Sequence, residues 1–106
     1  MSQGPSPATG TVEGTGATIN ISCGFKPSVV VLKNADGAAR LEWDDSMPDA
    51  SGMKTVAAGT YSYITTLGIT PYEGAVGSAS WGFTIGADTD VNVSAETIHW
   101  EAYRND

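Results

Sequence analysis

The chain has 106 residues, a length that suits a single domain, and 41% of them are hydrophobic, as in an ordinary globular protein. Only 16% are charged and thirteen are glycine, a composition that favours strands and tight turns over helices. The formal charge of −7 at pH 7 repels phosphate backbones and anionic lipid, which argues against nucleic-acid and membrane partners and leaves a basic protein surface as the complementary partner.

Cysteine usage and the first residues bear on the compartment. Cys23 is the only cysteine, so neither an internal disulfide nor a zinc site built from several thiolates is possible. The N-terminal stretch lacks the basic and apolar regions of a signal peptide, and no apolar run approaches the roughly 18 residues that span a bilayer. We therefore expect a soluble protein that is made in a cytosol.

The first 16 residues differ in composition from the rest. They are mostly Gly, Pro, Ser and Thr and have almost nothing to bury, so the segment cannot offset its ordering entropy alone. The sequence predicts a flexible N-terminal arm over residues 1–16 and one β domain over residues 17–106. Either the arm is a free tail, or it docks in an extended form on a neighbouring subunit.

Strand patterns begin at residue 17. Residues 17–22 alternate, and residues 28–34 are a β-branched run short enough for a core strand. Asn-Ala-Asp-Gly at 34–37 predicts a hairpin with a type I′ turn, because Asp-Gly readily takes positive φ angles. Residues 38–45 return as a strand with Leu41 and Trp43 on one face.

The second half of the chain continues this pattern. Residues 54–68 hold one or two strands with a possible bulge at Gly59, and residues 69–80 are loop-rich. Residues 79–86 alternate again, and the chain closes with a predicted hairpin around Ser94-Ala95. Six to eight short strands with turn signals mostly every 8 to 12 residues predict an all-β fold: an antiparallel β-sandwich, jelly-roll-like, or a small barrel.

Two carboxylates and an amide follow one another at Asp88, Asp90 and Asn92, in a D-x-D-x-N spacing. A calcium loop also needs a glycine at its sixth position and a closing glutamate at its twelfth, and the sixth position here is Val93. Asp and Asn equally cap turns by accepting backbone N–H groups. The stretch predicts a turn, with a calcium site as a weak alternative.

The remaining polar candidates give no catalytic assignment. His99 falls on the polar face of an alternating strand, where a solvated or cross-strand-paired side chain is expected. Glu42 with Asp44 or Asp45 could flank a sugar as an acid/base pair, but their separation is not fixed by sequence. Because neither a nucleophile elbow nor a phosphate-binding loop is present, we expect no enzyme activity and no cofactor.

Aromatic side chains are a stronger signal. Three tryptophans in 106 residues are many, and Trp43, Trp81, Phe83 and Trp100 all fall in alternating stretches. We expect these four side chains to pack in the core between the sheets. The alternative is an exposed stacking platform for sugar rings, as in a carbohydrate-binding module.

Residues 22–104 resemble small virion proteins encoded in tailed bacteriophages and prophages. The likeness is carried by GFKPSVVVLKN (residues 24–34) and most densely by GFTIGADTDVNVSAETIHW (residues 82–100). Among virion parts, the chain looks most like a head decoration (cement) protein, because it is small, acidic and β-rich with an extended N-terminal arm.

The resemblance implies a non-enzymatic protein on the virion capsid surface, synthesised in the cytoplasm of the bacterial host. It implies two partners, the major capsid protein and other copies of the same chain in dimers or trimers, and a stabilising role against internal DNA pressure. The arm would then carry the capsid or subunit contacts, through Gln3, Pro5, Pro7, Thr9, Thr11 and Val12. A tail or fibre component and a carbohydrate-binding module are the alternatives.

Overall fold

The computed structural model describes residues 7–73 and 81–104, which form eight β-strands and no helix. The strands are β1 (Ala8–Glu13), β2 (Ile19–Ser22), β3 (Val29–Asn34), β4 (Ala39–Asp44), β5 (Ser51–Thr55), β6 (Tyr61–Tyr72), β7 (Gly82–Ile85) and β8 (Thr97–Tyr103). The predicted all-β, antiparallel fold is confirmed.

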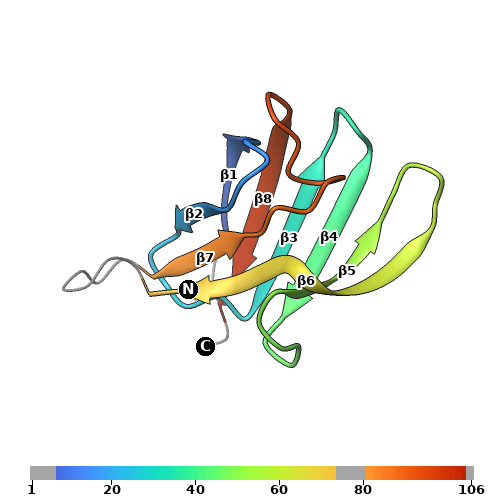
Figure 1. Cartoon of the computed structure of the whole chain (residues 1–106). Helices are drawn as coiled ribbons and strands as arrows, with labels where there is room; N and C mark the ends of the chain where they lie inside the picture. The colour runs from blue at the N-terminus through green and yellow to red at the C-terminus, as the bar shows by residue number, and fades with distance from the viewer. Residues whose placement is uncertain (1–6, 74–80, 105–106) are drawn as a thin grey trace, which may run out of the picture.

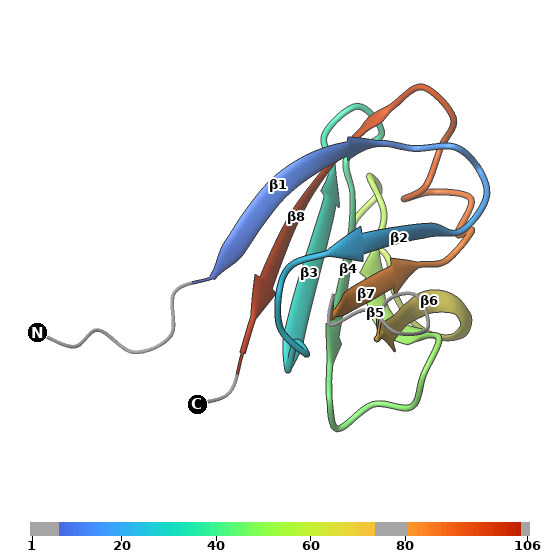
Figure 2. The same cartoon turned by 90° about the vertical axis from the view of Figure 1, so that its left-hand side faces the viewer.

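All the strands belong to a single sheet, in the order β1-β8-β3-β4-β5-β6-β7-β2, and every neighbouring pair is antiparallel. The sheet curls into a half-barrel, so that β7 and β2 lie across the opening of the curved wall formed by β1, β8, β3, β4 and β5 (Figure 1). The two edge strands are β1 and β2, which follow one another in sequence and diverge from their connection (Figure 2).

The half-barrel has two walls, the curved wall defined above and a second wall formed by β7 and β2. The long strand β6 makes the curl possible, because it pairs with a strand of each wall. Its first half pairs with β5 and its second half pairs with β7. Between them the register with β5 shifts from Gly52↔Ile64 to Ser51↔Ile69. At the bend a Cβ on Gly68 would lie 2.2 Å from the carbonyl oxygen of Ser51, so this close approach requires glycine. The bulge predicted at Gly59 is therefore wrong: Gly59 lies in the β5–β6 turn.

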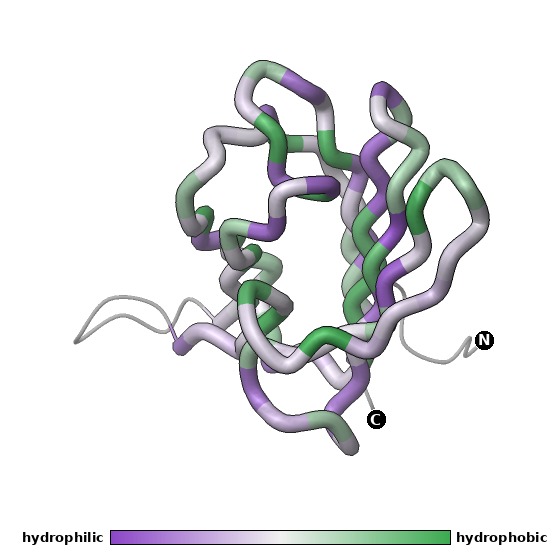
Figure 3. Tube along the Cα trace, turned by 45° about the vertical axis from the view of Figure 1, so that its right-hand side comes forward, coloured by the Kyte–Doolittle hydropathy of each residue, from purple (hydrophilic) through white to green (hydrophobic). Residues whose placement is uncertain are grey.

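The hydrophobic core fills the space between the two walls. Alternating positions of β4 and β8 are buried, as expected of strands with one face on the core. Hydrophobic and hydrophilic residues alternate in colour along parts of the tube (Figure 3). The buried hydrophobic cluster consists of Val30, Leu32, Ala39, Leu41, Trp43, Ile69, Phe83, Ile85, Val91, Ile98 and Ala102. The strands thus form one core, which is enough for a single domain of this length.

The β3–β4 hairpin forms as predicted, but its turn differs. Its loop has four residues, and the positive φ of 55° belongs to Ala38 and not to Gly37. The Oδ1 atom of Asn34 accepts the N–H of Gly37 at 3.0 Å, which fixes an Asx-type turn. The type I′ prediction is therefore wrong, because the buried side chain of Asn34 selects a longer loop.

The predicted hairpin around Ser94-Ala95 is also wrong in its first half. Residues 91–94 form no strand, although Ala95 does lie in a turn, with φ 69°. The last strand, β8, instead pairs with β1 on one side and β3 on the other. Polar side chains, and not a strand ladder, hold the loop that precedes β8.

The flexible arm predicted over residues 1–16 is wrong for residues 8–13, which form β1. This strand pairs with β8 from Ala8↔Ala102 to Glu13↔Thr97. A Cβ on Gly10 would lie 2.7 Å from the Trp100 ring, so the small residue lets the indole pack against the strand. Main-chain bonds and packing of Val12 on the core therefore supply the stabilisation that composition alone does not reveal. Residues 1–6 lie outside the described part.

Candidate functional site

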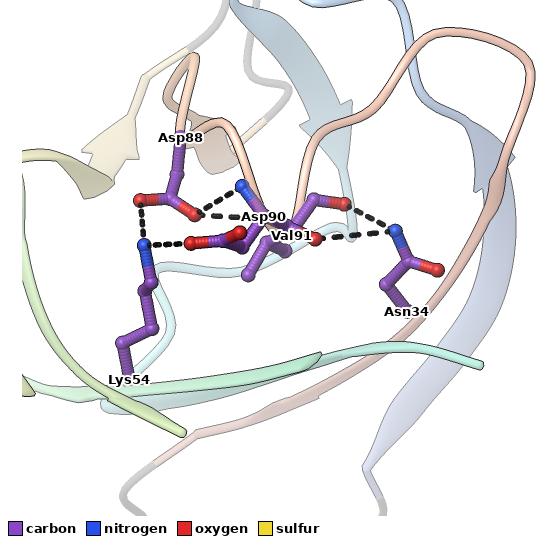
Figure 4. A network of polar contacts seen from close by, with 5 residues as sticks. All are labelled: Asn34, Lys54, Asp88, Asp90 and Val91. Atoms are coloured by element: carbon purple, nitrogen blue, oxygen red, sulfur yellow. Dashed lines mark hydrogen bonds and ion pairs between the residues drawn. The ribbon is translucent and has the colours of Figure 1, made fainter. Parts of the chain in front are cut away.

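The loop between β7 and β8, residues 86–96, is fixed to the sheet by a polar network (Figure 4). Lys54 reaches up from β5, and its Nζ atom lies 2.9 Å from Oδ1 of Asp88 and 2.6 Å from Oδ2 of Asp90. The other oxygen of Asp88, Oδ2, accepts the backbone N–H groups of Asp90 at 3.0 Å and Val91 at 3.1 Å. Asp88 therefore caps its own turn and binds the sheet at the same time.

The ion pair between Lys54 and Asp88 is shielded from water. The side chains are only 13% and 6% exposed, respectively, so the charge of Asp88 depends on Lys54 for its compensation. Burial lowers the pKa of Lys54, but the hydrogen bonds to Asp90 and Asp88 and the charges of both carboxylates outweigh it and raise the pKa above its ordinary value. Lys54 is thus held in its charged form.

This geometry explains the D-x-D-x-N spacing as architecture. The Lys54 ammonium lies between the carboxylates of Asp88 and Asp90, where a metal cation would otherwise bind. Asn92 does not join them: its Oδ1 accepts the N–H groups of Thr15 and Gly16. Within residues 7–73 and 81–104, no three His, Cys, Asp or Glu side chains are grouped as metal ligands. The three residues proposed as weak calcium ligands do not converge on one point.

Two buried asparagines complete the network, and sequence reasoning missed the role of both. The Nδ2 group of Asn34 donates to the carbonyl oxygen of Val91 at 3.1 Å and to Oε1 of Glu96 at 2.9 Å. The Nδ2 group of Asn92 donates to the carbonyl oxygens of Ala17 at 2.6 Å and Gly86 at 3.0 Å. The only signal in the sequence is that Asn34 ends a β-branched strand on its inward side.

Two of the three carboxylates considered for sugar hydrolysis, Glu42 and Asp44, are already engaged locally. Glu42 accepts a hydrogen bond from the Arg40 guanidinium at 2.5 Å. Asp44 accepts the hydroxyl and, at 2.9 Å, the backbone N–H of Ser46, and these bonds lower its pKa. Asp44 thus stabilises a turn, and Glu42 forms an exposed ion pair with a residue of its own strand.

The four aromatic residues divide into core and surface positions. Trp43 is 2% exposed and donates its Nε1–H to the carbonyl of Pro48 at 3.2 Å, and Phe83 is fully buried. Trp100 packs against the core, with its ring edge-on to Phe83 at 5.6 Å between centroids. Trp81 is half-buried outside the core cluster, with Lys26 Nζ 5.6 Å from its ring centroid. The core prediction is wrong for Trp81 alone, and Trp43 is too buried to be a sugar platform.

The convex side of the curved wall carries mostly polar side chains, and we call it the outer face. Directly paired residues point to the same side of a sheet, so the strand register defines two rows across it. The first row is Thr9, Glu101, Val31, Glu42, Met53 and Tyr63, and the second is Thr11, His99, Lys33, Arg40, Thr55 and Tyr61.

Opposite charges are paired along the outer face. Lys33 Nζ lies 3.3 Å from Oε2 of Glu101, and the hydroxyl of Tyr103 donates to Oε1 of the same carboxylate at 3.2 Å. That hydrogen bond and the charge of Glu101 raise the pKa of Tyr103. At the β1 end, a hollow of about 490 Å³ opens between Thr9, Thr11, Lys33 and His99, among others.

The two rows end on the most exposed large hydrophobic side chains that the structure describes. Tyr61 is 74% exposed and Tyr63 is 51% exposed. Tyrosine combines an apolar ring with a hydrogen-bonding tip and is enriched in protein–protein interfaces. Two neighbouring exposed tyrosines beside paired charges therefore make the outer face the strongest candidate binding surface of the described chain.

The residues expected to make arm contacts are separated by the fold. Thr9 and Thr11 lie on the outer face beside Glu101 and His99, whereas Val12 points inward and is half-buried. Pro7 is exposed immediately before β1. Gln3 and Pro5 lie outside the described residues.

The described residues contain no helix that is long and apolar enough to cross a membrane. Comparison of the chain with protein-family models, with curated proteins and with solved structures gives no match.

Proposed function

We propose that this protein is a non-enzymatic structural component of a bacteriophage virion, a decoration protein that binds the major capsid protein lattice and stabilises the head. The resemblance of residues 24–34 and 82–100 to virion proteins motivates the viral assignment. The observation that carries the binding mode is the pair of exposed side chains, Tyr61 and Tyr63, at the end of the charge-paired rows of the outer face.

The chemistry of the outer face suits a protein partner. Aromatic and arginine side chains carry much of the energy in such interfaces, and Tyr61, Tyr63 and Arg40 lie close together in its two rows. The net charge of −7 favours a lattice that presents basic residues and speeds the encounter with it. Because many copies bind one lattice, each contact needs only modest affinity.

The rigidity of the sheet supports the same proposal. The outer face belongs to a continuous ladder from β1 to the first half of β6, and the buried Lys54–Asp88 pair fastens the adjoining loop. A preordered surface loses little conformational entropy when it binds. Such a scaffold transmits load between neighbouring lattice subunits through backbone hydrogen bonds.

The direct test is to mix the purified protein with phage heads that lack it and to measure co-sedimentation. We expect the Tyr61→Ala/Tyr63→Ala double variant to lose at least about tenfold in affinity, because each truncated interface anchor costs about 1–2 kcal/mol. Tyr72→Ala, a tyrosine on the other half of β6, is the matched control and should retain binding. Equal binding by the double variant and the control contradicts the outer face as the contact surface.

Labelling of intact virions with a specific antibody locates the protein. Regular label over the head supports the proposal. Label confined to the tail contradicts the capsid role and assigns the protein to tail assembly. Absence of label on purified particles contradicts any virion role.

A further inference from the structure

In the described part of the chain, β1 is an edge strand, so half of its main-chain N–H and C=O groups have no strand partner. The bonds to β8 show which groups these are. The N–H of Gly14 donates to the carbonyl of Glu96 at 2.8 Å, and the carbonyl of Gly14 accepts the N–H of Ala95 at 3.0 Å. Main-chain groups alternate in direction along an antiparallel strand. The N–H and C=O groups of Gly10 and Val12 therefore point to β8, whereas those of Thr9, Thr11 and Glu13 point to the open edge.

The opposite side of β8 agrees with this assignment. The carbonyl of Tyr103 accepts the N–H of Ser28, which precedes β3, at 2.7 Å. The main-chain N–H and C=O groups of odd-numbered residues of β8 thus point to β3, and those of even-numbered residues point to β1. Thr11 lies opposite His99, but its N–H and C=O groups make no bond to β8.

The two edges of the sheet differ in how they are protected. Natural edge strands avoid association by being short, or by carrying lysine, proline or a bulge. The edge strand β2 has four residues, whereas β1 has six, with no lysine, proline or register shift among them. Within residues 7–73 and 81–104, no strand pairs with β1 on the side away from β8, and this side is open in Figure 2. An unprotected regular edge is a template for another strand.

The sequence of β1 is complementary to itself in one antiparallel register. With a two-fold axis at Thr11, Thr11 lies opposite Thr11 of the second copy and Thr9 lies opposite Glu13. Each of these pairs exchanges two main-chain bonds, and threonine pairs are favourable across strands. Other registers are less favourable. A shift toward the start of β1 sets Pro7, which lacks an N–H, opposite Glu13 of the second copy. A shift toward the end of β1 loses the pair that Thr9 makes, and a further shift sets the two Glu13 side chains opposite each other.

We propose that two copies of this chain associate through the free edges of β1, antiparallel and in register at Thr11, to form one continuous sheet. The same register sets the half-buried Val12 opposite Gly10 of the second copy. In each copy the Trp100 ring packs against Gly10, so Val12 also comes close to that ring. The dimer therefore covers apolar surface that one copy leaves partly exposed. It does not depend on the proposed virion role.

Sedimentation equilibrium of the purified protein tests the dimer. We expect a mass twice the 10.9 kDa of one chain, and half that value for Thr11→Pro, which removes one N–H from the free edge without touching the bonds to β8. Ser22→Pro is the matched control, since the Cys23 N–H bonds to Trp81 and Ser22 therefore faces the other free edge. This variant should remain a dimer. A wild-type mass of 10.9 kDa at about 1 mM protein, or a Ser22→Pro monomer beside a Thr11→Pro dimer, overturns the proposal.

A cross-linking experiment guards against misfolding of the proline variant. In a Cys23→Ser background, Thr11→Cys places two thiols on strand partners with Cα atoms about 5.5 Å apart, within disulfide range. Oxidation should give a covalent dimer for Thr11→Cys and none for Ser62→Cys, an exposed position on β6. Equal cross-linking of the two variants, or no covalent dimer from Thr11→Cys, contradicts pairing at this edge.

Discussion

Lys54 Nζ lies 2.9 Å from Oδ1 of Asp88, and this contact joins β5 to a loop 34 residues further along the chain. Since Asp88 also accepts the backbone N–H groups of Asp90 and Val91, a single carboxylate orders the turn and attaches it to the sheet. The charge of Asp88, which sequence suggested as a metal ligand, is already balanced by the protein itself.

Removal of the Lys54 ammonium should destabilise the fold strongly. We expect Lys54→Met to lower the free energy of unfolding by about 3–5 kcal/mol, because Asp88 is left as an uncompensated buried charge. Lys33→Met is the matched control, since its partner Glu101 and Lys33 itself are 32% and 44% exposed, and it should cost at most about 1 kcal/mol. Urea unfolding followed by tryptophan fluorescence measures both. Equal losses in the two variants would contradict the structural role of the buried pair.

The same contact predicts a loss of stability at high pH. The pKa of Lys54 is raised in the folded state, so its contribution is fully present below its ordinary pKa of 10.5 and disappears as the pH rises through the higher folded value. The melting temperature should therefore fall above about pH 10.5. In Lys54→Arg the side chain stays charged in this range, and the part of the fall due to residue 54 should vanish. Identical pH profiles for the two proteins would show that other groups cause the loss.

Calcium should leave the protein unchanged. Because Lys54 already neutralises Asp88 and Asp90, and Asn92 binds backbone groups elsewhere, we expect melting temperatures in calcium and in a chelator to agree within about 1 °C. Thermal unfolding followed by circular dichroism makes the comparison. A calcium-dependent rise that Asp88→Asn abolishes would show that the loop binds the ion after all.

The side chain of Asn92 should matter more than its place in a loop suggests. It hydrogen-bonds to main-chain groups of Thr15, Gly16, Ala17 and Gly86, and Asn92→Ala leaves several of them without a partner. We expect a loss of about 2–4 kcal/mol in unfolding free energy. Asn20→Ala, which removes one exposed bond to Thr84, should cost below about 1 kcal/mol. Similar values for both would mean that Asn92 does not hold the β1–β2 connection.

The Cys23 thiol should react slowly. Burial raises its pKa more than its hydrogen bonds to the backbone lower it, so less reactive thiolate is present at about pH 8 than for a free cysteine. We expect alkylation by iodoacetamide to be at least several-fold slower in the folded protein than in concentrated urea, measured by mass spectrometry. Equal rates would show that the thiol is fully accessible.

Much of the fold could be predicted from alternation along the chain. Leu41 and Trp43 occupy inward positions two residues apart, and Ile98 and Ala102 do so four residues apart, as period-two patterns require. The arm failed as a prediction because residues 8–13 offer little hydrophobic signal. Their strand forms because β8 supplies hydrogen bonds and because the Trp100 ring packs on Gly10. Neither contact can be predicted from residues 1–16 alone.

The candidate site was harder to predict, because its parts come from distant segments. The outer face needs the register that sets Tyr63 beside Met53 and Met53 beside Glu42, and no local pattern encodes that alignment. Asn34 and Asn92 were missed for a similar reason, since an isolated asparagine in a strand or loop gives no sign of the backbone groups that it will meet.

Composition and alternation along the chain were enough to predict an acidic all-β domain with one core and to tell which side of most strands is buried. The order of the strands, the position of β1 at an edge and the neutralisation of Asp88 by Lys54 became visible only in the folded chain. The difference arises because alternation is a property of residues two positions apart. Strand partners and buried ion pairs are instead set by a collapse that brings together residues tens of positions apart.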